Sequence, residues 1–252
     1  MSGPGQGMHV ALFATCINDT LAPQIPRATV AVLERLGCTV HFPTAQACCG
    51  QMHTNSGYYD EAVPMVRSYV DAFGGFDYVV SPSGSCVGSV RHQHPMVAAH
   101  AGDSGLQRAA EAISSRTYEF TEFLVGVLGV EDVGAYFPHR VTYHASCHAL
   151  RIAHVGDRPQ RLLRAVRGID FVELPGTAQC CGFGGTFSLK NPDVSIAMAA
   201  DKARAVRSTD AEYVVSTDQA CLLNIGGTLH RQRSGVRTMH LAEVLAHTTE
   251  VA

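Results

Sequence analysis

An internal repeat built around cysteine constrains this 252-residue chain more than any other feature of its sequence. Each half carries one cysteine, then an adjacent pair followed by glycine, then one more cysteine. The intervals are 32 and 37 residues in the first half and 33 and 40 in the second. Short hydrophobic runs around the cysteines also correspond, so we interpret the chain as a duplicated unit. The two sets are Cys16, Cys48, Cys49 and Cys86, and Cys147, Cys180, Cys181 and Cys221.

Within each half, short β-branched runs alternate with helix-like stretches, a pattern typical of a parallel sheet. We therefore predict an α/β fold of two tandem, pseudo-symmetric α/β units, each with a small parallel sheet flanked by helices. Amphipathic periodicity predicts helices over residues 25–36 and 192–206. Residues 87–115 fit a loop and one helix packed on the first unit, or part of a partner surface. The expected strands are 10–14, 40–43, 78–81, 141–144, 171–174 and 213–216.

The repeat also sets the expected unit boundaries. A first unit is expected at 9–130 and a second at 140–252, after a flexible terminus at 1–8. A linker is expected at 131–139, because its opening residues break both the helix and the strand periodicity.

Charge and hydropathy exclude several classes of protein. The 19 basic residues are outnumbered by 22 acidic ones, and neither half is basic enough to bind nucleic acid. The longest apolar runs have about eight residues, whereas a helix needs ~20 to span a bilayer, so no transmembrane segment is expected. The first residues lack the basic and apolar stretches of a secretory signal, which favours a cytoplasmic protein.

Nine cysteines without an export signal indicate metal binding rather than disulfides. Adjacent residues have Cα atoms about 3.8 Å apart, too close for an ordinary disulfide, but both thiols can face one metal centre. Four thiolates suit zinc or an iron-sulfur cluster. The paired C-x2-4-C knuckles usual for zinc are missing, which favours an iron-sulfur cluster. Cys38 has no equivalent in the second half and is expected to be a buried apolar thiol.

Glycines accompany both cysteine pairs. Gly50 and Gly182 follow the pairs directly and would let the backbone approach a bulky inorganic core. Backbone N–H groups near such a cluster would also tune its potential. Gly184 and Gly185 lie in a stretch that is similar to a phosphate-binding loop, but their place beside the cysteines favours packing around the same cofactor.

Two histidines flank the first cysteine of the second set. His144 and His148 stand where the first unit has Phe13 and Ile17. Each could move a proton or hydrogen-bond a sulfur, or be an ordinary structural histidine, and they are the candidates for a catalytic role. Three other histidines are expected on the surface, namely His53, His92 and His94.

Three motifs carry a resemblance to a known family. They are Pro-Ser-Gly-Ser-Cys at 82–86, Ser-Cys-His-Ala-Leu-Arg at 146–151 and Cys-Cys-Gly-Phe-Gly-Gly-Thr-Phe-Ser-Leu-Lys at 180–190. With the duplicated cysteine sets, the chain resembles the cysteine-rich CCG-domain proteins. That group includes the cysteine-rich subunit of heterodisulfide reductase and the iron-sulfur subunits of glycolate oxidase and anaerobic glycerol-3-phosphate dehydrogenase. Within it, the chain is most similar to the lactate-utilisation protein A family of bacteria, over essentially its whole length.

The resemblance implies an iron-sulfur electron-transfer subunit of an oxidoreductase complex. That complex would oxidise L-lactate to pyruvate without NAD and would support growth on lactate. The resemblance also implies one or two clusters of the [4Fe-4S] type, held by the two cysteine sets. Two partner proteins are implied as well, one of them a ferredoxin-like iron-sulfur protein.

One departure from the family pattern limits the cluster chemistry. The heterodisulfide reductase pattern ends in C-x-x-C, whereas Ser89 follows Cys86 and Asn224 follows Cys221 at that spacing. A fifth thiolate is missing in both units, which favours at most four thiolates per unit and argues against disulfide reduction. The alternatives left open are a heterodisulfide-reductase-like or glycolate-oxidase-like subunit, and a metal-stabilised assembly partner with no redox role.

Overall fold

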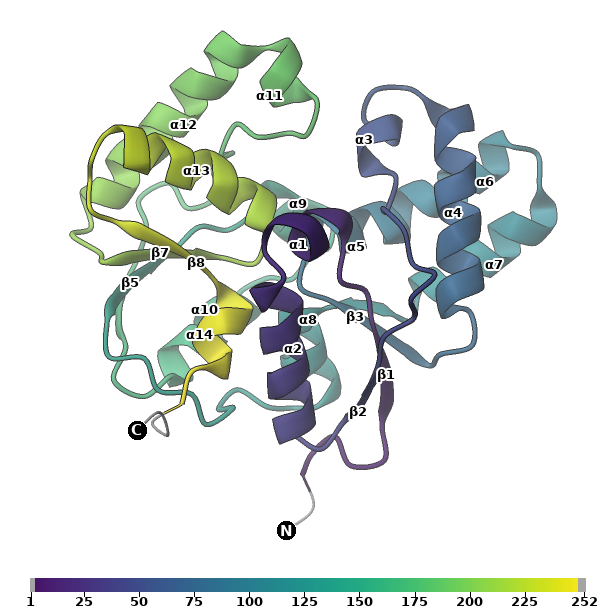
Figure 1. Ribbon diagram of the computed structural model, residues 1–252, viewed down its shortest axis with the longest axis horizontal. Coiled ribbons are helices and arrows are strands. Elements are labelled where there is room, and N and C mark those ends of the chain that lie inside the picture. Colours follow the sequence, from purple (N-terminus) through teal and green to yellow (C-terminus); the bar gives the residue numbers. More distant parts are fainter. Residues whose placement is uncertain (1–2, 249–252) are drawn as a thin grey trace.

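Two four-stranded parallel sheets form the framework of the computed structural model, which describes residues 3–248 (Figure 1). The strand order is β2-β1-β3-β4 in the first sheet and β6-β5-β7-β8 in the second. All pairings are parallel, which confirms the predicted fold of two tandem α/β units. The strands are β1 (His9–Leu12), β2 (Thr39–His41), β3 (Tyr78–Ser81), β4 (Thr117–Glu119), β5 (Arg140–Tyr143), β6 (Asp170–Val172), β7 (Tyr213–Ser216) and β8 (Arg237–His240).

The sequence predicted three of the four strands in each sheet and missed the last one, which lies at an edge. The six predicted strands are present within two residues of their expected ends. The missed strands are β4, paired through Val79 and Thr117, and β8, paired through Val214 and Thr238. β4 has only three residues and β8 begins with two exposed polar ones. Neither therefore shows the apolar run that marks a buried strand.

Helices fill the connections between the strands. The helices predicted over 25–36 and 192–206 are confirmed as α2 and α12. The first unit contains α1 (Cys16–Leu21), α2 (Gln24–Arg35), α3 (Gln51–Thr54), α4 (Tyr59–Phe73), α5 (Gly84–Gly88), the π-helix η1 (Ser89–Gln93), α6 (His94–His100), α7 (Ser104–Ser114), α8 (Phe120–Glu122) and the π-helix η2 (Phe123–Val127). The second contains α9 (Cys147–Arg151), α10 (Arg158–Ala165), α11 (Phe187–Lys190), α12 (Pro192–Arg207), α13 (Gln219–Arg231) and α14 (Leu241–Ala246).

Residues 87–115 are more helical than the sequence predicted. The expected loop with one helix is wrong, because α5, η1 and α6 run on without a break and α7 follows as a second helix. Pro95 lies at the start of α6, directly after the π-helix η1. α6 and α7 both pack on α4. In Figure 1 these three helices form one lobe of the first unit.

Helices near the end of each unit contact the other unit. α14, at the end of the second unit, packs on α2 of the first, and α8 of the first unit packs on α10 of the second. One hydrophobic core therefore runs across both sheets and includes Leu33 of α2, Leu163 of α10 and Leu245 of α14. In Figure 1, yellow α14 lies beside purple α2.

The segments expected to lie outside the two units are packed where the structure describes them. The Gly5 N–H donates to the Leu36 carbonyl oxygen at 2.9 Å. Val133, Ala135 and Phe137, in the expected linker, are buried in the shared core. Residues 1 and 2 of the expected flexible terminus lie outside the described residues.

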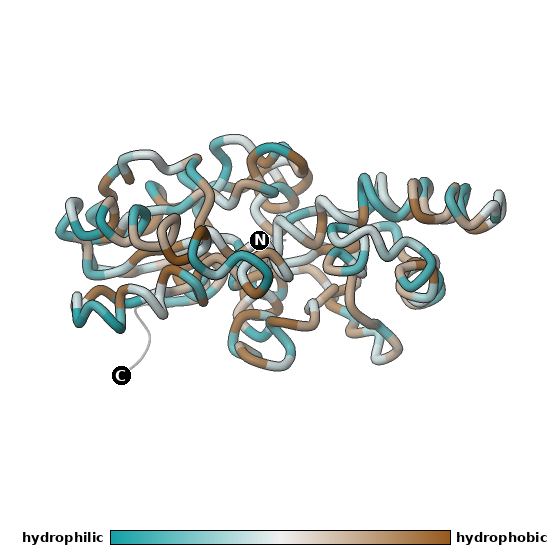
Figure 2. Tube along the Cα trace, turned by 90° about the horizontal axis from the view of Figure 1, so that it is seen from above, coloured by the Kyte–Doolittle hydropathy of each residue, from teal (hydrophilic) through white to brown (hydrophobic). Residues whose placement is uncertain are grey.

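Seen from above, the molecule is elongated, and hydrophilic and hydrophobic segments alternate along its helices (Figure 2). This alternation is typical of helices that bury one face and expose the other. Across residues 3–248, none of the helices has both the length and the apolar character that crossing a membrane requires.

Candidate metal centre

The cysteines of the repeat lie beyond the carboxyl ends of the strands, where ligands gather in open parallel sheets. The first cysteine of each unit begins a short helix after an inner strand, Cys16 after β1 and Cys147 after β5. The last cysteine lies in the helix after the other inner strand, Cys86 in α5 and Cys221 in α13. The adjacent pairs lie in the loops that follow β2 and β6.

Close packing between the units brings the two cysteine sets together. α5, which carries Cys86, packs against α9, which begins with Cys147. A Cβ atom at Gly84 would stand only 2.5 Å from the Ala149 Cβ, so glycine is what lets these two helices touch. A corresponding contact joins α1 to α13. The helix of the first cysteine in each unit therefore meets the helix of the last cysteine in the other.

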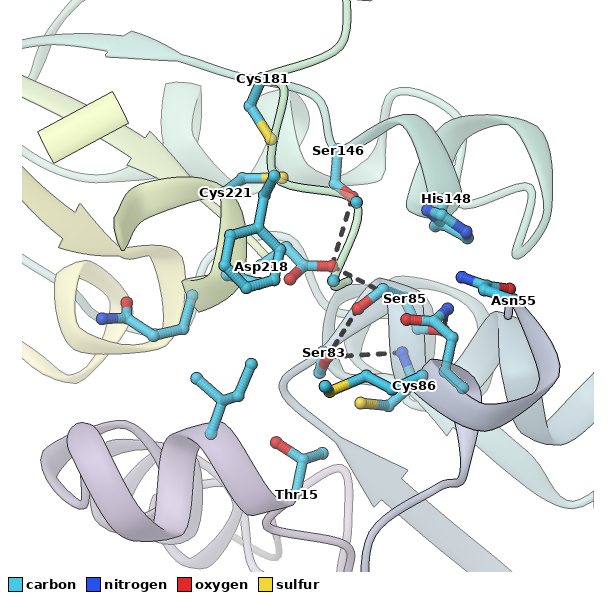
Figure 3. A pocket seen from close by; sticks show the side chains of 18 of the residues that line it. Thr15, Asn55, Ser83, Ser85, Cys86, Ser146, His148, Cys181, Asp218 and Cys221 are labelled. Atoms are coloured by element: carbon cyan, nitrogen blue, oxygen red, sulfur yellow. Dashed lines mark hydrogen bonds between the residues drawn. The ribbon is translucent and has the colours of Figure 1, made fainter. Parts of the chain in front are cut away.

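These contacts surround one cavity of about 270 Å³. A single water needs only ~15 Å³, so the space suits a far larger occupant. The cavity is lined by all eight cysteines of the repeat, by His148, and by Gly184 and Gly185. Figure 3 shows cysteine side chains of both units around this space. Cys38 lies elsewhere, 5% exposed in the hydrophobic core, as predicted.

The sulfur atoms within each set are close enough to share protons. The Cys16 thiol donates to Cys48 across 3.5 Å, and this bond lowers the pKa of Cys48 and raises the pKa of Cys16. In the second unit, a hydrogen bond from Cys147 likewise lowers the pKa of Cys180. One thiol of each set therefore ionises readily, whereas the pKa of two others is raised, those of Cys16 and Cys49 in the first set and of Cys147 and Cys181 in the second. Ionising all four thiols of a set requires a cation between them.

The glycine after each cysteine pair turns the backbone toward a thiol. Gly50 and Gly182 have φ of 77° and 85°, the left-handed region that favours glycine. Their N–H groups donate to the sulfur of Cys48 at 3.5 Å and of Cys180 at 3.3 Å. A Cβ atom at Gly182 would stand 2.7 Å from the Ser195 carbonyl oxygen, so a side chain has no room there. These glycines contact the thiols through their backbone and do not themselves line the cavity.

A loop from each unit meets the other beside the cavity. The Ser56 and Thr186 hydroxyls are hydrogen-bonded at 2.9 Å, which joins the segment after α3 to the segment before α11. Gly184 and Gly185 have φ of 54° and 62°, and a Cβ atom at Gly185 would contact the Met52 side chain at 3.4 Å. The glycine-rich stretch therefore closes the cavity against the opposite unit.

The two histidines that flank Cys147 lie in different environments. His148 lines the cavity, and its Nδ1 lies 3.6 Å from the Cys147 sulfur. His144 is fully buried behind the thiols, and burial lowers its pKa to about 3. His144 is therefore neutral at physiological pH, so it can offer a nitrogen lone pair.

One histidine that was predicted on the surface is buried. His94 is 1% exposed, and its Nε2 lies 2.8 Å from the Cys49 carbonyl oxygen. The prediction was wrong because α6 packs on α4, where the His94 ring lies edge-on against Tyr69 at 5.1 Å. Burial lowers the pKa of His94 to about 4, so the ring supports the first cysteine pair in its neutral form. His92 is exposed as predicted, and His53 is partly buried.

Sequence reasoning missed Asp218, a buried carboxylate between the two units. Its Oδ2 accepts hydrogen bonds from the Ser85 N–H at 3.0 Å and from the Ser146 hydroxyl at 3.2 Å (Figure 3). Each serine directly precedes a cysteine of the repeat, so one carboxylate joins cysteine segments of both units. The first unit has Ser83 at the corresponding place, and its hydroxyl caps α5. An aspartate in one half of the repeat where the other half has serine was the signal in the sequence that could have identified Asp218.

Hydrogen-bonding side chains occupy the two positions where a fifth cysteine is missing. Asn224 donates to the Cys181 carbonyl oxygen at 2.8 Å, and Ser89 donates to the Gln93 Oε1 at 2.7 Å. Neither residue lines the cavity. Each unit therefore offers four thiols to this space.

The duplicated sheets and cysteine sets define a class of cysteine-rich protein. A family model described as "CCG: Cysteine-rich domain" matches residues 10–91 and 141–226, one segment in each unit. The chain belongs to this CCG cysteine-rich domain family.

Curated relatives agree over nearly the whole chain. The chain is 48% identical to lactate utilization protein A of Oceanobacillus iheyensis over 238 residues, which cover 94% of this chain and 96% of that protein. It is 47% identical to lactate utilization protein A of Geobacillus kaustophilus, with 94% and 98% covered. The Bacillus subtilis protein of the same name is 45% identical, with 94% and 99% covered.

A solved structure shares the fold at low sequence identity. A hypothetical protein from Helicobacter pylori matches with a TM-score of 0.60 and 9% identity, over 100% of this chain. The chain spans 51% of that protein's length. This likeness concerns the fold alone.

Proposed function

We propose that this chain is an iron-sulfur electron-transfer subunit of a multi-protein system that oxidises L-lactate to pyruvate. The observation that carries the proposal is the single cavity lined by all eight cysteines of the repeat. Relatives named lactate utilization protein A, 45% to 48% identical, support lactate as the substrate of the system.

The residues around the cavity fit an iron-sulfur cluster of the [4Fe-4S] type. Thiolates are soft ligands, and four of them cannot ionise together without a cation, which a metal centre supplies. When bound, such a cluster provides one-electron transfer. The proposed ligands of one or two clusters are Cys16, Cys48, Cys49 and Cys86 of the first set, and Cys147, Cys180, Cys181 and Cys221 of the second.

Other side chains and backbone groups tune this site. The N–H groups of Gly50 and Gly182 donate to thiol sulfurs and stabilise their negative charge, which raises a reduction potential. Met52 and Phe187, together with the glycine-rich stretch, restrict water on one side of the cavity. The Nδ1 of His148 lies beside the Cys147 sulfur, within hydrogen-bonding reach.

The proposal extends to partners and organisation. We assign two partner proteins, one of them ferredoxin-like and carrying further clusters, a path of electrons that does not use NAD, and a cytoplasmic location. We also assign 9–130 and 140–252 as the two functional units, joined by 131–139. The two segments that match the family model fall within these limits, which supports the assignment.

Metal analysis of protein purified without oxygen tests the proposal. We expect about four or eight iron and sulfide ions per chain, and an electron paramagnetic resonance spectrum that changes when dithionite is added. Zinc alone, or a folded protein without metal, would contradict the redox role and favour a metal-stabilised or passive assembly partner.

A second experiment connects the cysteines to the activity. The Cys49→Ser/Cys181→Ser variant, assembled with both partners under anaerobic conditions, is expected to lose lactate oxidation. Cys38→Ser is the matched control, because this buried thiol lies away from the cavity, and its complex should oxidise lactate at the rate of the parent. Normal oxidation by a variant with all eight cavity cysteines replaced would sink the proposal.

A further inference from the structure

His144 is a buried polar side chain whose hydrogen-bonding capacity is unused. It lies directly after β5 and is 0% exposed. Within residues 3–248, neither its Nδ1 nor its Nε2 has a hydrogen-bond partner. A buried imidazole normally has at least one partner, and leaving it without any costs about 1–3 kcal/mol. The orphaned nitrogens therefore call for a ligand that the polypeptide does not supply.

Two thiols of the second set lie next to this ring. A ring nitrogen of His144 and the sulfur atoms of Cys181 and Cys221 all lie within 4.8 Å of one another, and all three residues are buried. Imidazole nitrogen and thiolate sulfur are the two donor types that zinc and iron centres share in proteins. Cys181 and Cys221 line the cavity and the His144 ring lies directly behind them, so the three atoms are close enough to bind one metal at that wall.

The first unit has no such group at the corresponding place. Phe13 follows β1 there, and its ring packs edge-on against Tyr69 at 5.1 Å and Phe73 at 5.5 Å. The ring is fully buried in apolar surroundings and has no polar atom to satisfy. The difference is therefore chemical, because the same position holds an inert ring in one unit and a free nitrogen donor in the other.

The helices at corresponding places in the two units, α4 and α12, also differ in the residues that they bury. α4 and α12 bury residues at the same spacing, but a lysine and a valine of α12 stand where α4 has the aromatic rings that contact Phe13. The corresponding buried residues are Ala62, Val66, Tyr69 and Phe73 on α4, and Ser195, Ala199, Lys202 and Val206 on α12, which also buries Ala203.

We infer that His144 is a nitrogen ligand of the metal centre in the second unit, together with Cys181 and Cys221. The inference rests on the proposed function, because it takes the second cysteine set to hold an iron-sulfur centre. The two units then bind different centres, one with sulfur donors alone and one with sulfur and nitrogen.

Pulsed electron paramagnetic resonance with labelled histidine tests the inference. The full-length protein is purified without oxygen from cells fed either natural-abundance or 15N-labelled histidine, and is reduced with dithionite. We expect the strong hyperfine coupling of a directly bound nitrogen, changed by the label. This comparison uses the unmodified sequence, so it does not depend on whether a variant folds.

Two variants then identify the histidine. His144→Phe introduces the residue found at the corresponding position of the first unit, and it should abolish the nitrogen coupling. His148→Phe is the matched control, since its ring lies beside Cys147, and it should retain the coupling. A coupling that persists in His144→Phe, or that is lost only in His148→Phe, would overturn the inference.

The outcomes separate this inference from the proposed function. Protein with iron and sulfide but without nitrogen coupling would keep the iron-sulfur proposal and refute the role of His144. Protein without iron would refute the proposed function. In that case X-ray absorption of the zinc-loaded protein decides on His144, and a zinc shell with sulfur only would refute its role as a ligand.

Discussion

The two units have the same sheet topology and line opposite sides of one cavity, but the residues behind their thiols differ. Behind the first set lie the aromatic rings of Phe13 and Tyr69, and behind the second lie the imidazole of His144 and the buried Lys202. The Nζ of Lys202 donates to the Gly176 carbonyl oxygen at 2.6 Å. Duplication has thus kept the cysteines while their surroundings diverged, so the two sets are not electrostatically equivalent.

The charge on Lys202 adds to this difference. Burial lowers the pKa of Lys202, whereas the nearby thiolates of the second set act in the opposite direction. A cation close to these sulfurs stabilises their ionised form. The residue at the same place in the first unit is Tyr69, whose burial raises its pKa and keeps it neutral.

Removing thiols from one unit at a time is expected to have the largest effect. Thiol contacts run within each set, as between Cys16 and Cys48, and within residues 3–248 no hydrogen bond joins a thiol of one set to a thiol of the other. We therefore expect Cys49→Ser/Cys86→Ser and Cys181→Ser/Cys221→Ser each to lose about half of the iron. Iron analysis and the paramagnetic spectrum of each variant measure this.

The remaining spectrum should differ between the two double variants, because each keeps a different centre. Loss of all the iron in either variant would break the comparison, since it would mean that the two sets converge on one centre.

The next largest effect concerns how the stability of the fold depends on pH. At one corresponding position the first unit carries a buried acid and the second a buried base. Glu119 caps the helix after β4 and His240 caps the helix after β8, each in a capping box. Burial raises the pKa of Glu119 to about 7 and lowers the pKa of His240 to about 4. Glu119 therefore stabilises the fold below its ordinary pKa of 4.5, and this contribution is lost as pH rises through 7. His240 stabilises it above 6.5, and that contribution is lost as pH falls through 4.

Two variants separate these contributions. Relative to the parent, Glu119→Gln should gain stability as pH rises from 4.5 to 8, by up to ~3 kcal/mol in the free energy of unfolding. His240→Asn keeps an N-cap acceptor and should gain stability as pH falls from 6.5 to 4. Urea unfolding across this range measures both. Changes of the same sign in both variants would show that the two positions do not oppose each other.

The smallest expected effect compares Asp218 with Ser83. Asp218→Ala leaves the Ser85 N–H and the Ser146 hydroxyl without their acceptor and should cost about 2 kcal/mol. Ser83→Ala removes a helix cap within one unit and should cost about 1 kcal/mol. Urea unfolding at pH 7 compares the two.

Asp218→Asn serves as the control, because an amide oxygen can still accept both hydrogen bonds. Equal costs for Asp218→Ala and Ser83→Ala would show that the carboxylate adds no link between the units.

The repeat allowed most of the fold and the set of cavity cysteines to be predicted. Strands such as β3 and β7 are short apolar runs, and their positions follow from local pattern alone. Gly84 and Asp218 could not be recognised in this way, because their importance depends on a neighbour from the other unit. His94 was misplaced because its burial depends on the packing of α6 against α4, which the sequence around it does not show.

The contacts between the units are reciprocal, α14 on α2 and α8 on α10, as they are between the two partners of a two-fold symmetric dimer. Here both partners belong to one chain. Their association is therefore intramolecular, and dilution cannot separate the two walls of the cavity. A dimer of identical chains would have to change both walls together, whereas this chain can place phenylalanine on one side and histidine on the other.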